Sequence, residues 1–220
     1  MKRLFLFLIL LSLCCPSISA RFDLRTAMPL ADAKTLPFSS NSEFLAEYAL
    51  DNPDNIIPDK IYKNFQLTDF SRVRDFPNTD LGLILCFKSH MGNDVDLALV
   101  MVSGISDPSC YILISVDDNF QIIDTLEAGI NFGNIPVRQF YATENKEVFV
   151  YQLVPSTTTS IPLETFRYVD AYITETVYQI DSAGKFIKMS EKRTPNSRTY
   201  TREQLDNKET CLWDLFNAQY

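Results

Sequence analysis

Residues 177–190 read VYQIDSAGKFIKMS, and this stretch predicts a β-hairpin. A strand rich in β-branched and aromatic residues ends at Asp181, and an apolar strand returns after Gly184. The Asp side chain can accept hydrogen bonds from backbone amides in the turn, and glycine tolerates a positive φ. LISVDDNFQIIDT (113–125) has the same layout 64 residues earlier, with Asn119 as its residue tolerant of positive φ.

The two hairpins predict a repeated unit. Val116–Ile123 aligns without gaps on Ile180–Ile187. Short apolar runs alternate with turn residues from residue 81 onward, which predicts two successive four-stranded meanders, 81–126 and 135–190. Each meander ends with one of the two hairpins. The predicted strands are 81–87, 96–102, 110–116, 120–126, 135–142, 147–154, 166–180 and 185–190.

Several of these strands are apolar on both faces. In EVFVYQLV (147–154), valines occupy one face, and Phe149, Tyr151 and Leu153 occupy the other. A sheet with one wet face would alternate apolar and polar residues. We therefore expect cover on both sides, from the opposite meander and from the N-terminal segment or a C-terminal helix. This predicts a mostly β, antiparallel fold in which the meanders pack as a sandwich-like or propeller-blade-like unit.

Four-stranded meanders covered on both faces resemble the blades of β-propellers. YQIDSAGKFIK (178–188) is similar to the hairpin that often closes a blade. The resemblance implies no functional residue. Two blades cannot close a propeller, which favours a single two-sheet sandwich or a strongly twisted antiparallel assembly.

The segments that flank the meanders predict helices. A short N-terminal helix is expected where Ser42 can cap the run EFLAEYAL, and residues 21–40 are expected to form an extended leader. At the other end, Thr201 and Gln204 have the spacing of a capping box, which predicts a C-terminal helix over about 201–218. Residues 41–220 are thus expected to form one β-rich domain.

The first twenty residues have the layout of a secretory signal peptide. Two basic residues precede a short apolar run, and small residues end at Ala20. The run is about half of the roughly 20 residues that span a bilayer, so a cleaved signal is favoured over an anchor. Cys14 and Cys15 offer a lipidation alternative, which would tether the chain to a membrane. We expect export to a periplasmic, cell-surface or extracellular location.

Charge and cysteine content exclude several classes of protein. The signal contains two of the 20 basic residues and none of the 28 acidic ones, which leaves a mature charge of −10. An acidic chain does not suit nucleic acid. Three cysteines remain after the signal, Cys86, Cys110 and Cys211. An odd number leaves one unpaired, and strand spacing separates the first two, so buried or half-buried thiols are expected.

The motifs of cofactor chemistry are missing from the sequence. His90 is the only histidine, which excludes a multi-histidine zinc site. Neither a phosphate-binding loop nor Gly-x-Gly-x-x-Gly nor Gly-x-Ser-x-Gly occurs, so no cofactor is predicted. Asp94 and Asp96 have the spacing of a calcium loop, but the rest of that pattern is absent. An acidic hairpin loop is the simpler interpretation.

One predicted strand face has the chemistry of a binding site. In FRYVDAYITETVYQI (166–180), alternation places Val169, Ala171 and Ile173 on one face, which is the expected core. The opposite face then carries Phe166, Tyr168, Asp170, Tyr172, Thr174 and Thr176. Tyr168, Asp170 and Tyr172 are the predicted ligand-binding residues, because tyrosine combines apolar area with a polar tip. A half-covered strand face without function is the alternative.

These observations favour an exported, non-enzymatic binding domain of a bacterial-type cell envelope, whose partner is a protein or a glycan. Two alternatives remain. Abundant carboxylates permit a hydrolase such as a glycosidase, which needs a convergent pair of Asp or Glu residues. A structural or assembly subunit of an envelope complex would instead present a large apolar surface.

Overall fold

The computed structural model describes residue 28 and residues 33–41, 56–57, 82–103, 109–132, 134–157 and 166–220. The predicted signal peptide with Cys14 and Cys15, and the helix predicted after Ser42, lie outside the described residues. None of the described residues before position 82 is helical.

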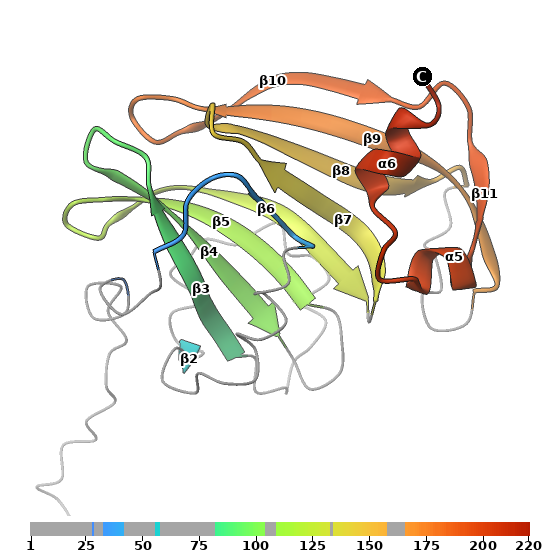
Figure 1. Cartoon of the computed structure of the whole chain (residues 1–220), viewed down its shortest axis with the longest axis horizontal. Coiled ribbons are helices and arrows are strands. Elements are labelled where there is room, and N and C mark those ends of the chain that lie inside the picture. The colour runs from blue at the N-terminus through green and yellow to red at the C-terminus, as the bar shows by residue number, and fades with distance from the viewer. Residues whose placement is uncertain are drawn as a thin grey trace, which may run out of the picture.

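The described residues form one antiparallel sheet of eleven strands (Figure 1). Its order is β10-β9-β8-β7-β6-β5-β4-β3-β2, while β1 pairs with β7 and β11 pairs with β9. The eight predicted strands are confirmed, in meander order. The strands are β1 (Phe38–Ser39), β2 (Ile56–Ile57), β3 (Gly82–His90), β4 (Val95–Ser103), β5 (Ser109–Asp117), β6 (Ile122–Phe132), β7 (Ile135–Ala142), β8 (Glu147–Pro155), β9 (Tyr168–Ile180), β10 (Phe186–Arg193) and β11 (Arg198–Thr201).

The prediction that two four-stranded meanders pack as a sandwich-like or propeller-blade-like unit is wrong, because β6 continues into β7 in the same sheet. The two strands pair from Phe132↔Ile135 to Ile130↔Arg138 and then diverge. Register shifts interrupt the β5–β6 and β6–β7 ladders, and such bulges bend a strand. The sheet therefore turns at this seam instead of ending there, and it does not close into a barrel.

The first apolar core lies between the two halves of the sheet. It combines residues of β4–β6 with residues of β7–β9 and with Phe38 of β1, whose ring packs edge-on against Phe140. Its buried members are Phe38, Met91, Val95, Leu97, Leu99, Met101, Tyr111, Leu113, Leu126, Ala128, Phe140, Ala142, Val148, Val150 and Ile180.

Strand β1 occupies the edge of β7 that β6 leaves open. Phe38 and Ser39 pair with Ala142 and Tyr141. The backbone amide of Ser40 donates to the carbonyl of Phe140, and its hydroxyl accepts from the amide of Phe140. Buried backbone groups need such partners, so the N-terminal segment completes the ladder where the sheet splits.

The second core lies on the other face of β7–β9, beneath two short helices, α5 (Arg202–Asp206) and α6 (Leu212–Asn217). The predicted cap is confirmed, since Thr201 accepts a hydrogen bond from the amide of Gln204. The single helix over 201–218 is wrong. Asn207 ends α5 in an extended conformation, and the chain re-enters a helix only after Cys211.

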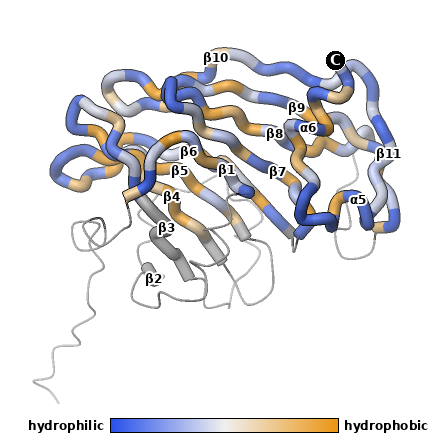
Figure 2. Tube along the Cα trace, in the orientation of Figure 1, coloured by the Kyte–Doolittle hydropathy of each residue, from blue (hydrophilic) through white to orange (hydrophobic). Residues whose placement is uncertain are grey.

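Burial on both faces of β8 is confirmed. Val148 and Val150 belong to the first core, Tyr151 and Leu153 belong to the second, and Phe149 packs against the second. Figure 2 shows the hydrophobic colour along the central strands of this half, whereas β10 and β11 are mainly hydrophilic.

The two predicted hairpins have the same turn. Oδ1 of Asp117 accepts from the amides two and four residues ahead, at 2.9 and 2.8 Å, and Oδ1 of Asp181 does the same at 2.9 and 2.8 Å. The residues with positive φ are Phe120 (57°) and Gly184 (81°). The expectation that Asn119 takes the positive φ is wrong, because the next residue, Phe120, takes it. Phe120 is also the residue that the gapless alignment pairs with Gly184.

These two hairpins also contact each other. The hydroxyl of buried Ser115 donates to the carbonyl of Gly184 at 2.6 Å, and Oδ2 of Asp124 accepts from the amide of Phe186 at 3.0 Å. The β9–β10 turn thus rests on β5 and β6. The repeated hairpins hold the two halves of the sheet together at one end.

Candidate ligand-binding site

Strand β9 positions the predicted binding residues. Ala171 and Ile173 are fully buried in the second core under the helices, as expected from the alternation. Tyr168, Asp170 and Tyr172 therefore lie on the opposite side, together with Thr174. We call this side of β9 the tyrosine face. Its position opposite α5 and α6 leaves it uncovered by the two C-terminal helices.

The tyrosine face joins aromatic and polar groups from three strands. Tyr168 is 66% exposed. The exposed carboxylate of Asp170 accepts a hydrogen bond from the hydroxyl of Thr199 on β11. The guanidinium carbon of Arg193 on β10 lies 4.0 Å from the centre of the Tyr172 ring. Ring, carboxylate, hydroxyl and guanidinium thus lie within one stretch of sheet.

Phe166 does not belong to this face, which corrects the prediction. It is buried in the second core, and Arg202 lies over its ring at 5.6 Å. The reason is that β9 begins at Tyr168, so strand alternation does not extend back to residue 166.

A row of polar residues crosses four strands next to the tyrosine face. Thr174 pairs with Arg193 of β10 on one side and with Gln152 of β8 on the other, and Gln152 pairs with Arg138 of β7. Residues directly opposite each other in an antiparallel ladder point to the same face. We call Arg193, Thr174, Gln152 and Arg138 the polar row. It marks the boundary of the first core, since Val150 and Phe140 are two residues further along β8 and β7.

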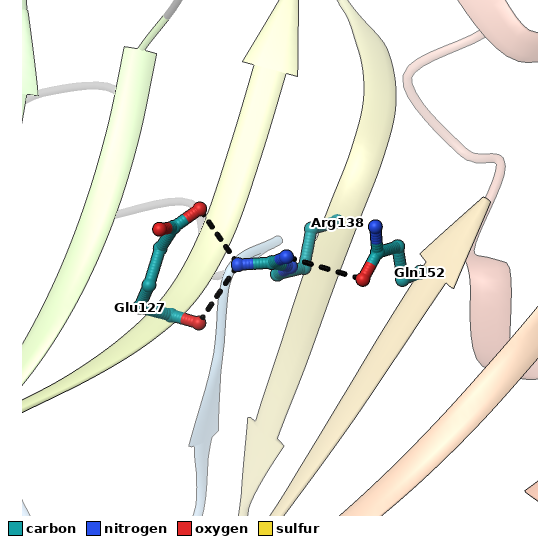
Figure 3. A network of polar contacts seen from close by, with 3 residues as sticks. All are labelled: Glu127, Arg138 and Gln152. Atoms are coloured by element: carbon teal, nitrogen blue, oxygen red, sulfur yellow. Dashed lines mark hydrogen bonds and ion pairs between the residues drawn. The ribbon is translucent and has the colours of Figure 1, made fainter. Parts of the chain in front are cut away.

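Arg138 is the best-held member of the polar row (Figure 3). Nη1 donates to the carboxylate of Glu127 at 2.6 Å and to its backbone carbonyl at 3.3 Å, while Nη2 donates to Oε1 of Gln152 at 3.1 Å. Glu127 lies in the part of β6 that no longer pairs with β7. Arg138 therefore bridges the split in the sheet.

Two buried polar atoms near this seam remain unpaired among the described residues. These atoms are Nε of Arg138, a donor, and Oδ1 of Asn131 on β6, an acceptor. Most buried polar groups in proteins have a partner, which is often an ordered water molecule.

Cys110 lies within electrostatic range of the same ion pair. Burial raises the pKa of its thiol to about 12, the negative charge of Glu127 adds to that increase, and Arg138 partly opposes it. A thiol with this pKa stays protonated and unreactive at neutral pH. Cys110 and Cys211 are both unpaired, as predicted, whereas the side chain of Cys86 lies outside the described residues.

The sequence located part of this site and missed the rest. Alternation along one strand identified Tyr168, Asp170 and Tyr172. It could not supply Arg193 or Thr199, because those residues reach the tyrosine face only through strand register. A signal for Arg138 existed, since it is the single charged residue in the mainly apolar strand IPVRQFYA (135–142).

No group of three or more metal-binding side chains occurs in the part of the chain that the structure describes. Nδ1 of His90 and Oδ1 of Asp96 lie 2.8 Å apart at an exposed hairpin end. Across the described ranges, no helix is long and apolar enough to cross a membrane.

The chain was compared with known proteins in three ways. No protein-family model, no curated protein and no solved structure matches it.

Proposed function

We propose that this chain is an exported binding domain of a cell envelope and that it binds a glycan on the tyrosine face. Export rests on the signal-like residues 1–20. The observation that carries the binding proposal is the grouping of Tyr168, Asp170, Tyr172 and Arg193 on a sheet face that α5 and α6 do not cover.

The chemistry of this face suits sugars. An exposed tyrosine ring offers a flat apolar surface for the C–H face of a pyranose, and carboxylate, hydroxyl and guanidinium groups offer partners for its hydroxyls. Tyr168 supplies an exposed ring, Asp170 supplies an acceptor two residues further along β9, and Arg193 supplies donors beside Tyr172. A second strand, β11, fixes Asp170 through Thr199, so the polar partner is oriented before any ligand arrives.

The positions and partners of the carboxylates favour binding over hydrolysis. A glycosidase needs two carboxylates that converge on one bond. Glu127 is paired with Arg138, and Glu175 accepts a hydrogen bond from the hydroxyl of Tyr151. Asp170 and Glu175 occupy opposite faces of β9, because an odd number of positions separates them.

Glycan-array screening of the purified protein, followed by calorimetry on each hit, tests the proposal. Tyr168→Ala and Tyr172→Ala are expected to lower the affinity about 3- to 10-fold each, since an aromatic contact contributes about 0.5–1.5 kcal/mol beyond its buried area. Tyr141→Ala is the matched control. Tyr141 is 39% exposed, but it lies on β7 outside both the tyrosine face and the polar row.

Three outcomes would contradict the proposal. The protein binds no glycan, or it binds glycans equally well without Tyr168 and Tyr172, or its bound oligosaccharides are cleaved during the incubation. The last result would support a hydrolase. If a purified envelope protein binds at Tyr168 in competition with the glycan, the ligand is a protein instead of a glycan.

A further inference from the structure

We infer that the glycan is anionic, with carboxylate or sulfate groups that Arg193 recognises. This inference rests on the proposed function. It adds a chemical class to the ligand, and it follows from the way charge is distributed along the sheet.

Charge is segregated in a chain whose net charge is −8. Residues 89–137 contain seven Asp or Glu residues and no Lys or Arg. Residues 166–202, which include β9, β10 and β11, contain seven Lys or Arg against four Asp or Glu, a net charge of +3. A basic edge on an acidic protein attracts acidic partners to that edge.

One basic side chain, Arg193, lies on the tyrosine face, because it pairs with Thr174. Lys192 and Arg198 pair with Glu175 and Ala171, so they lie at the same edge of the sheet but point to its other face. Arg167 directly precedes β9, Lys192 and Arg193 end β10, and Arg198 begins β11; all four are exposed. Within the described ranges, no acidic side chain forms a salt bridge with any of them. Lys188 differs, because it is paired with Glu191.

Arg193 is the residue best placed to contact an anion beside Tyr172. It belongs to the polar row, its guanidinium stacks on Tyr172 at 4.0 Å, and its side chain is exposed. Stacking orients the planar fork without using its N–H donors, which leaves them for a bidentate contact with a carboxylate or sulfate. Because strand register and stacking hold the side chain, little of its freedom is lost on binding.

The experiment compares sugars that differ only in charge. Oligogalacturonate is measured against its methyl ester, and dextran sulfate against dextran, by calorimetry at low and high salt. We expect at least one acidic form to bind about tenfold or more tightly than its neutral counterpart, with the advantage shrinking at high salt. Arg193→Gln should remove most of that advantage and weaken neutral-sugar binding by a smaller factor, whereas Arg193→Lys should retain part of the advantage.

Lys208→Gln is the control, because it removes one exposed positive charge in the link between α5 and α6. It should change affinity less than twofold. Neutral sugars that bind through Tyr168 as tightly as acidic ones would overturn this inference and leave the proposed function standing. No binding of either form would overturn both. If inorganic polyphosphate binds as tightly as the acidic sugars and Tyr168→Ala does not weaken that binding, charge attraction alone explains the result and the inference is overturned.

Discussion

Gln139 joins three parts of the fold, and its replacement by Met should release the C-terminal helices. The side chain is 3% exposed. Its Oε1 accepts from the amide of Leu212, the first residue of α6, at 2.6 Å, and its Nε2 donates to Oδ1 of Asn41 at 2.8 Å. Helix amides at this position have no partner within the helix, and Cys211 at the N-cap provides no side-chain hydrogen bond.

Nε2 of Gln139 also donates to the carbonyl of Thr210 at 3.5 Å, so Gln139→Met keeps the length of the side chain and removes three hydrogen bonds. The buried amide of Leu212 would lose its partner, which costs about 1–3 kcal/mol, and the part-buried Asn41 would add a smaller amount. We expect a total loss of about 2–4 kcal/mol in the free energy of unfolding. For a chain of this size, the melting temperature should fall by roughly 4–16 °C.

Trp213 makes the assay specific, because it is the only tryptophan and lies in α6, with its ring 6.2 Å from that of Tyr151. Denaturant titration is followed by Trp fluorescence and by far-UV circular dichroism. In Gln139→Met, the midpoint of the fluorescence transition should shift to a lower denaturant concentration. This shift should be at least as large as the shift of the dichroism midpoint. Gln121→Met is the control, because this exposed turn glutamine donates only to the exposed carbonyl of Asn119.

Gln139→Glu adds a pH test. A carboxylate can accept from Leu212 but cannot donate to Asn41, so this variant should be less stable at pH 7 than at pH 4, where protonation restores a donor. A change below 0.5 kcal/mol for Gln139→Met, with both probes unfolding as in the wild type, would refute the reasoning.

Two further predictions concern the hairpin contact and the thiols. Gly184→Ala should destabilise the protein by about 2–3 kcal/mol, because φ is 81° and a Cβ would lie 2.9 Å from Cδ1 of Ile123, whereas Gly92→Ala, with φ 78° and no atom within 4 Å, should cost only about 1 kcal/mol; equal melting temperatures would refute the packing argument. Cys110 should resist alkylation at pH 8 in the native protein and react only on unfolding, which peptide mapping by mass spectrometry would detect, while half-buried Cys211 reacts first. Since folding raises the pKa of Cys110 from 9.0 to about 12, its contribution to stability is complete below pH 9 and is lost as the pH rises toward 12, so alkaline titration should show a steeper loss of stability than in Cys110→Ala.

Pattern and turn chemistry predicted much of the fold. Alternation and turn residues located the eight strands, and the gapless match of Val116–Ile123 with Ile180–Ile187 led to two turns with the same hydrogen bonds. These features depend on neighbouring residues, so the sequence contains them directly. The helix over 201–218 failed for the opposite reason, because the amide of Leu212 is satisfied by Gln139, 73 residues away.

The sequence by itself determined the strands, the hairpin turns, the doubly buried β8 and the shared face of Tyr168, Asp170 and Tyr172. Only the tertiary structure decided that the two meanders form one sheet, that β1 fills the split beside β7, and that Arg193 and Arg138 share a face with Tyr172. The physical reason is range. Strand formation depends on residues two to four positions apart, whereas strand register and the bend at the β6–β7 seam depend on partners that the chain brings together only on folding.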